Sequence, residues 1–281
     1  MPNDQLRRST GARRGHRAVR LATVVVTVGA LVALGLVLIG RYSTHRSATP
    51  TAGAGVGLAL ASHPPLKIAP WTRIATLGGP TPGYATSTSA TVVSELPAEW
   101  SGAASALPVI ESKHGRLKVR LVQRPNGVTA WIPASAASVS RTPYHLVVDL
   151  AARQLLVFKA AKLVRRAPAD IGTLQAPTPP GNYFVAQRDE APNPGYGPFV
   201  IVTSAFATTV TDWEQNGNAM IAISGPLGTG ALTRTQGGAV SQGGIRLPTR
   251  DLTRLRVLPL GTPIDVVTTL RPVGHRRSGR R

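Results

Sequence analysis

The segment Ser241-Gln242-Gly243-Gly244-Ile245-Arg246-Leu247 carries the most information about the fold of this chain. It places two adjacent glycines before a short apolar run that contains one arginine. Glycine permits positive φ and close backbone approach, so Gly243 and Gly244 can present amide groups to a carbonyl oxygen. Arg246 is charged at any accessible pH and can hold a carboxylate through two contacts. The competing interpretation is that Arg246 only ties its loop to a neighbouring carbonyl or aspartate.

Short runs of β-forming residues surround this segment. Tyr144–Leu150 and Gln154–Phe158 predict a hairpin around Ala151–Arg153. Thr249–Leu258 predicts a short helix, with Thr249 as N-cap and Asp251 in the first turn. Further strands are predicted at 162–166, 183–186, 199–202, 220–223 and 263–267. Because long crossover helices are missing, the sequence predicts a mainly β, mostly antiparallel domain over residues 143–269 with one or two short helices.

These pieces, in this order, resemble the L,D-transpeptidase (YkuD-type) family of cell-wall cross-linking enzymes. Ser241–Arg246 is similar to the family signature Ser-His-Gly-Cys-[Ile/Val]-Arg. The resemblance also includes the hairpin of 147–157, the strand 162–166, Gly172-Thr173, the Thr-Pro-x-Gly-like loop 177–181, Ile223-Ser224-Gly225 in place of Ile-His-Gly, and the closing turn 260–263. In the family, the cysteine thiolate attacks a peptidoglycan stem peptide and forms an acyl-enzyme. The resemblance therefore implies an exported cell-wall protein.

The chain departs from the family at the positions that carry the chemistry. Gly244 occupies the cysteine position, Gln242 the signature histidine and Ser224 the other histidine, and the chain has no cysteine. Glycine cannot attack, and an amide cannot take up a proton near neutral pH. Neither Ser224 nor Ser241 has a base nearby in sequence, because no histidine lies between His145 and His275. We therefore expect a catalytically inactive domain. The alternatives are an active L,D-transpeptidase with a non-cysteine nucleophile and a structural wall-associated spacer.

The resemblance implies a site that still binds stem peptides or a partner in wall synthesis, with Arg246, Gly243, Ser241 and Gly225 as the substrate-binding residues. Trp213 and the loop 192–197 can line the cleft, although such a loop is as often only a turn. We expect no cofactor and no metal, since metal-ligating residues do not cluster. We expect His145, at a strand start, to be structural.

The N-terminal part predicts a membrane anchor. Leu21–Gly40 is an uncharged run of 20 residues, which as a helix spans about 30 Å, the thickness of the hydrocarbon core. The arginines of the basic segment 1–20 favour a cytoplasmic N-terminus. We therefore expect a single-pass cell-membrane protein whose C-terminal domains lie outside the cytoplasm, facing the cell wall. A cleaved signal peptide is the alternative. Residues 41–65, rich in Ser, Thr, Ala, Gly and Pro, predict a flexible linker.

Residues 66–140 predict a small β module. Strands at 107–110, 116–122 and 129–132 are separated by turns at 113–115 and 124–127. Leu117, Val119 and Leu121 alternate with Lys118 and Arg120, as one buried strand face requires. The module resembles the SH3-like modules that often precede the transpeptidase domain. Its alternative roles are a spacer without a ligand and a wall-binding module.

The net charge of +20 comes from 32 Lys and Arg residues against 12 Asp and Glu residues. Residues 1–20 and 271–281 carry +5 each, and the remaining charge is spread along the chain. No helix-turn-helix, zinc-finger or RNP-like motif accompanies it, so we do not expect nucleic-acid binding. The basic tail 270–281 is predicted to be disordered. It is either simply solvated or in contact with anionic wall polymers or lipid headgroups.

Overall fold

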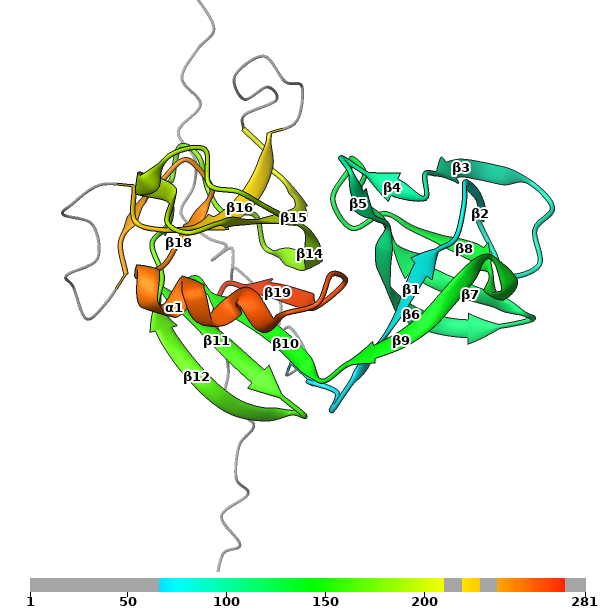
Figure 1. Ribbon diagram of the computed structural model, residues 1–281, viewed down its shortest axis with the longest axis horizontal. Coiled ribbons are helices and arrows are strands. Elements are labelled where there is room, and N and C mark those ends of the chain that lie inside the picture. The colour runs from blue at the N-terminus through cyan, green and yellow to red at the C-terminus, as the bar shows by residue number, and fades with distance from the viewer. Residues whose placement is uncertain (1–65, 210–218, 228–236, 271–281) are drawn as a thin grey trace, which may run out of the picture. The chain divides into compact units, whose positions relative to one another are not determined.

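The computed structural model describes residues 66–209, 219–227 and 237–270, which fall in one compact unit (Figure 1). This part of the chain contains two large β-sheets and one α-helix, so the mainly β prediction is confirmed. Among the described helices, none is long and apolar enough to span a membrane. The predicted anchor 21–40, the linker 41–65 and the basic tail, except its first residue 270, lie outside the described residues.

The first sheet has seven strands in the order β3-β2-β8-β7-β6-β1-β9. The strands are β1 (Thr72–Leu77), β2 (Thr81–Tyr84), β3 (Val92–Leu96), β6 (Ala106–Lys113), β7 (Arg116–Arg120), β8 (Thr129–Pro133) and β9 (Ala137–Thr142). A separate two-stranded ribbon consists of β4 (Glu99–Trp100) and β5 (Ala103–Ala104), and η1 (Ala134–Ala136) is one 3₁₀ turn. In β7, Leu117 and Val119 are buried, as the alternating pattern predicts.

The second sheet has eight strands in the order β12-β11-β10-β19-β14-β15-β16-β18. They are β10 (Tyr144–Asp149), β11 (Gln154–Lys159), β12 (Lys162–Pro168), β14 (Gly181–Asp189), β15 (Val200–Phe206), β16 (Met220–Ser224), β18 (Ile245–Arg246) and β19 (Pro263–Val267). The small sheet of β13 (Ile171–Gly172) and β17 (Ala239–Ser241) lies in the same part of the chain. The predicted hairpin is confirmed, because β10 pairs antiparallel with β11 from Tyr144↔Lys159 to Asp149↔Gln154.

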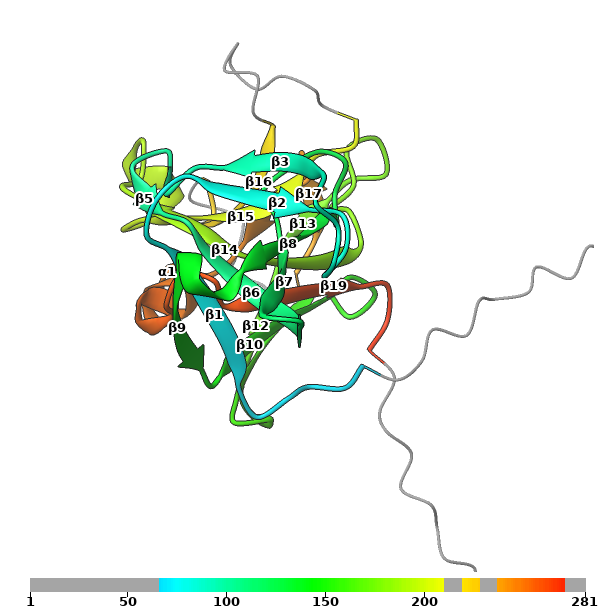
Figure 2. The ribbon, with the colours of Figure 1, turned by 90° about the vertical axis from the view of Figure 1, so that its right-hand side faces the viewer.

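Two pairings in the eight-stranded sheet are parallel. The last strand, β19, lies between β10 and β14 and pairs parallel with β10, with Leu146 opposite Ile264. At the edge of the sheet, β16 and β18 pair parallel, which sets Ser224 opposite Arg246. Figure 2 shows β19 running across the middle of the molecule. The other pairings in this sheet are antiparallel, as predicted.

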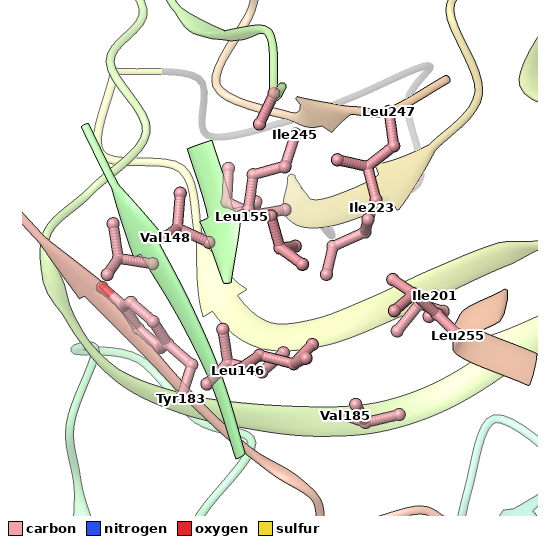
Figure 3. Close-up of a cluster of buried hydrophobic side chains, with 14 of the residues drawn as sticks. Leu146, Val148, Leu155, Tyr183, Val185, Ile201, Ile223, Ile245, Leu247 and Leu255 are labelled. Carbon is pink, nitrogen blue, oxygen red and sulfur yellow. The ribbon is translucent and has the colours of Figure 1, made fainter. Parts of the chain in front are cut away.

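The core beside the second sheet is mainly aliphatic and contains side chains from the sheet and from the helix. Side chains from nine strands meet there, among them Leu146, Leu155, Ile201, Ile223 and Ile245 (Figure 3). Each is at most 1% exposed. Burial of one such side chain contributes about 1.5–3 kcal/mol. The core reaches Ile223 and Ile245, the residues directly before Ser224 and Arg246, so it fixes the backbone that carries the candidate site.

The helix begins at Thr249, one residue earlier than a Thr249 cap requires. The predicted helix consists of α1 (Thr249–Arg254) followed by η3 (Leu255–Val257). The N-cap prediction is wrong: Pro248, with φ −53° and ψ 138°, is the last extended residue, and no side chain caps the helix. Because the proline ring fixes φ near the helical value, the chain turns into the helix directly after it. Leu252 and Leu255 attach the helix to the core.

A polar cluster centred on Asp265 stabilises the middle of the second sheet. The carboxylate of Asp265 accepts hydrogen bonds from His145 Nε2 at 2.7 Å and from Asn182 Nδ2 at 2.6 Å. Burial by itself would raise the pKa of Asp265, but the hydrogen bond and charge of His145, the hydrogen bond from Asn182 and the charge of Arg120 together lower it. His145 thus has a carboxylate partner within the sheet, which agrees with the structural role predicted for it.

Candidate functional site

A pocket of about 200 Å³ opens at the edge of the second sheet. Its walls come from η2 (Pro194–Tyr196), β16, the turn between β17 and β18, and short segments after β15 and β16. The described residues that line it are Tyr196, Ala207, Ala219, Met220, Ile221, Ala222, Ser224, Leu227, Ser241, Gln242, Gly244 and Arg246. The pocket therefore brings together all three positions that the resemblance marks as catalytic, and it adds a largely apolar wall.

Hydrogen bonds from the Thr173 main chain and the Thr178 side chain hold the turn of residues 241–244. The parallel β13–β17 pair places Gly172 opposite Ser241, and Thr173 donates its N–H to the Ser241 carbonyl at 3.0 Å. The buried Thr178 hydroxyl donates to the Gly243 carbonyl at 2.7 Å and accepts from the Gly172 N–H at 2.9 Å. Thr178 belongs to the loop 177–181 of the sequence resemblance, and its role in fixing the turn was not predicted.

The two glycines of the turn differ in backbone conformation and in the space available for a Cβ atom. Gly243 has a φ of 100°, and a Cβ there would lie 3.1 Å from Ile221 Cδ1. Gly244 has a φ outside the left-handed region, and a Cβ there would meet only the Ala222 carbonyl oxygen, at 3.4 Å. Glycine is thus needed at 243 for the backbone. Position 244 faces the pocket with room for a side chain that the sequence does not supply.

Both serine hydroxyls at the site donate to backbone carbonyls. Ser224 Oγ donates to the Gly225 oxygen at 3.1 Å, and Ser241 Oγ donates to the Gly244 oxygen at 2.5 Å. Both serines are buried. The described lining residues include no histidine, lysine, aspartate or glutamate. A serine nucleophile needs a base that takes its proton, and the described wall of the pocket contains none.

Arg246 is the one cation among the described lining residues, and its backbone is firmly paired. It exchanges two hydrogen bonds of 2.9 Å with the main chain of Asp170. Its guanidinium makes no hydrogen bond or ion pair with any residue in the described ranges. Arg246 does not tie its loop to a described carboxylate or carbonyl through its side chain. Within the described ranges, the donors of its side chain have no acceptor.

Asp170, opposite Arg246 in this bridge, was not identified in the sequence. It is fully buried; one carboxylate oxygen accepts from the Gly238 N–H at 2.5 Å, and the other, Oδ2, has no partner. A single carboxylate within the apolar stretch 167–171 is the signal that could have identified it, because buried carboxylates are rare unless they are paired.

The remaining predicted site residues lie around the pocket. Gly225 packs against the loop 192–197: its N–H donates to the Tyr196 carbonyl at 2.6 Å, and a Cβ would lie 2.9 Å from that carbonyl. Neither Gly225 nor Gly243 is among the lining residues, whereas Tyr196 of the same loop is. Trp213 lies outside the described residues.

Comparisons with known proteins show which family this domain resembles. A family model described as the L,D-transpeptidase catalytic domain, YkuD, matches residues 143–266. A curated YkuD protein of Bacillus licheniformis, named as an L,D-transpeptidase, is 30% identical over 125 residues, which are 44% of this chain and 66% of the relative. The chain thus spans just under two thirds of the length of that relative.

Solved structures of L,D-transpeptidases are also similar. One from Mycobacterium smegmatis is 16% identical, with a TM-score of 0.36 over 57% of this chain and 82% of that one. L,D-transpeptidase 3 from Mycobacterium tuberculosis is 15% identical, with a TM-score of 0.37 over 54% of this chain and 91% of that one.

Proposed function

We propose that this domain, whose residues 143–266 match the family model of the L,D-transpeptidase catalytic domain, binds peptidoglycan stem peptides without cross-linking them. The family acts on peptidoglycan stem peptides, and the pocket offers this chain a place to bind one. Its apolar wall accommodates aliphatic side chains of a peptide. The Arg246 guanidinium meets a carboxylate, and Gln242 supplies an amide at the exposed rim.

One observation carries the proposal: Arg246 has no partner in the described residues, while position 244 beside it has no side chain. Binding of a peptide needs only the guanidinium of Arg246. Catalysis needs a nucleophilic side chain at position 244, which is missing. An arginine whose donors lack an internal acceptor gains most from an external carboxylate, because a charge-assisted, two-pronged contact is about twice as strong as a neutral hydrogen bond.

We further propose that the protein is held at the cell membrane by residues 21–40, with this domain and the preceding β module outside the cytoplasm. The length and apolarity of that run support this placement, as does the cluster of arginines before it. We also propose that residues 66–140 serve as an SH3-like module, either as a spacer or as a wall-binding module. An anchored binding domain faces the wall that contains its ligand.

The experiment is a titration of the full chain, in nonionic detergent, with a synthetic tetrapeptide stem as free acid and as C-terminal amide. We expect the free acid to bind more tightly, because Arg246 recognises the terminal carboxylate. The Arg246→Gln variant should bind the free acid about tenfold or more weakly, the equivalent of one charge-assisted hydrogen bond. It should lose the preference between acid and amide.

Arg166→Gln is the matched control, since it removes one positive charge from the exposed part of β12 and leaves the pocket intact. We expect it to bind like the unmodified chain. If acid and amide bind equally well to all three proteins, Arg246 does not recognise the carboxylate. If no stem peptide binds at all, the proposal is overturned in favour of a spacer.

Mass spectrometry of the same mixtures tests the inactive state. We expect no covalent adduct and no cross-linked product after prolonged incubation with muropeptides. An adduct that disappears in a Ser224→Ala or Ser241→Ala variant would establish an active enzyme with a serine nucleophile. Combined Gly244→Cys, Gln242→His and Ser224→His substitutions ask whether the pocket supports acylation once these groups are supplied.

A further inference from the structure

Two arginine side chains lie against the same aromatic ring, that of Phe199. The guanidinium carbon of Arg256, on η3, lies 4.6 Å from the centroid of the Phe199 ring, and that of Arg188, on β14, lies 5.7 Å from it. Phe199 is 2% exposed and belongs to the core, so the ring is fixed. The ring face attracts both cations. Two side chains far apart in the sequence are thereby brought to one place on the surface.

Neither of these two guanidiniums has a described carboxylate partner within 4.0 Å. Arg188 donates through one terminal nitrogen to the Leu258 carbonyl at 2.6 Å, while its Nε is buried without a partner. Arg256 is exposed and makes no hydrogen bond to a described residue. Two adjacent positive charges therefore have no carboxylate partner in the part of the chain that the structure describes.

The pKa of Arg188 is affected by its burial and by the charge of the neighbouring Arg256. Burial, followed by the positive charge of Arg256, lowers the pKa of Arg188. A lowered pKa means that the surroundings disfavour the charged form. An anion bound near both guanidiniums would offset the repulsion between them and supply acceptors for the donors that remain free.

The same side of the domain carries a second cationic cluster. Asp251 of α1 lies 3.3 Å from Arg254, 3.5 Å from Arg250 and 3.8 Å from Arg165. One carboxylate therefore serves three guanidiniums, and the charge of the cluster is positive. Because η3 directly follows α1, the excess positive charge extends along both helical turns, from Arg250 to Arg256.

We propose that Arg188 and Arg256 form an anion site for a phosphate group of a phosphodiester polymer, which continues over the arginines of α1. A phosphate presents several acceptor oxygens in different directions, which suits two guanidiniums that approach from different elements. Repeated charges in the ligand suit the repeated arginines. A membrane surface is less suited, because η3 exposes a single large apolar side chain, Val257, beside them.

This site is separate from the pocket, since neither Arg188 nor Arg256 lines it. It does not depend on the stem-peptide proposal, and each can fail without the other. Together the two would give the domain a peptide-binding site and a polyanion-binding site.

The test titrates the full chain, in nonionic detergent, with a glycerol-phosphate oligomer and, separately, with glycerol phosphate monomer, polyglycerol and micelles doped with phosphatidylglycerol. We expect the oligomer to bind most tightly and uncharged polyglycerol not to bind. The Arg188→Gln/Arg256→Gln variant should bind the oligomer about tenfold or more weakly. The logarithm of its affinity should fall less steeply with the logarithm of salt, since two phosphate contacts are lost.

The matched control is Lys67→Gln/Lys113→Gln, which removes the same charge from two exposed positions that lie in the chain before residue 143. We expect less than a twofold effect. Arg256→Gln alone, at an exposed position, covers the case in which the double variant unfolds, and we expect it to weaken binding about threefold or more. Equal losses in control and test variants would overturn the site in favour of net charge alone. A loss seen only with phosphatidylglycerol micelles would overturn the polymer and assign a lipid.

Discussion

The polar groups around Asp265 and those around the pocket differ in how completely they are paired. Both carboxylate oxygens of Asp265 accept side-chain hydrogen bonds, from His145 and Asn182. Around the pocket, the Arg246 guanidinium has no partner in the described residues, and one carboxylate oxygen of Asp170, whose main chain pairs with Arg246, has no partner either. Complete pairing is typical of polar groups that stabilise a fold, and incomplete pairing marks groups left for a ligand. The comparison separates the histidine paired within the sheet from Arg246, the arginine proposed to bind a ligand.

The largest effect is expected from Asp265→Ala. The substitution removes the acceptor of His145 and Asn182 within the sheet, so we expect the free energy of unfolding to fall by about 3–5 kcal/mol. Chemical denaturation measures it. Glu190→Ala, at an exposed carboxylate that follows β14, is the control and should change stability by less than about 0.5 kcal/mol. Equal, small changes in both variants would contradict a structural role for the Asp265 cluster.

The free energy of unfolding at acid pH should also depend on the Asp265 cluster. The pKa of Asp265 is lowered in the folded protein, so the unfolded chain binds the proton more readily than the folded one. The stabilisation is present above the unfolded pKa, about 3.9, and is lost as the pH falls through the folded pKa. We expect Asp265→Asn to flatten this part of a plot of unfolding free energy against pH. An unchanged acid limb would show that other carboxylates determine it.

A smaller effect should separate the neighbouring glycines of the pocket turn. Gly243→Ala forces a Cβ into a positive-φ position, which costs about 1–2 kcal/mol. Gly244→Ala meets neither strain nor a close contact. It should be neutral or stabilise the protein by up to about 1 kcal/mol, because alanine restricts the unfolded chain. Denaturation midpoints of the two variants measure the difference, and a loss at 244 as large as at 243 would contradict the open space at 244.

The smallest effect is expected from Asp170→Asn. The new side-chain oxygen can still accept from the Gly238 N–H, and the other atom replaces an oxygen that has no partner. We expect a change of less than about 1 kcal/mol, clearly below that of Asp265→Asn. A larger loss at 170 would mean that its carboxylate is as completely used as that of Asp265.

The strands were predictable from the sequence because their local patterns agree with their final surroundings. Alternation in 116–121 and the turn 151–153 each specify a strand or hairpin without distant information. Three features required distant information. The insertion of β19 beside β10, the bridge between Asp170 and Arg246, and the Thr178 contact with Gly243 all join residues far apart in sequence.

The site was predictable to the extent that the motif specified it. The resemblance located Ser224, Gln242, Gly244 and Arg246, which line one pocket. It could not give the directions in which the two serine hydroxyls donate, because those depend on backbone carbonyls of the folded turn. The resemblance also could not show that the Arg246 guanidinium has no partner among the described residues, because that depends on where the carboxylates lie in the folded protein.

The position of β19 has a consequence for how the protein is made. A strand from the end of the domain separates β10 from β14, and Leu146 pairs with a residue as distant as Ile264. During synthesis, at about 5–20 residues per second, β10–β12 and β14–β18 emerge as two partial sheets that lack the strand between them. Until that strand arrives, each partial sheet has an open edge that can pair with another chain. The domain becomes a single sheet only when its last strand is in place, so a chain that ends before Pro263 would leave two edges exposed and prone to aggregate.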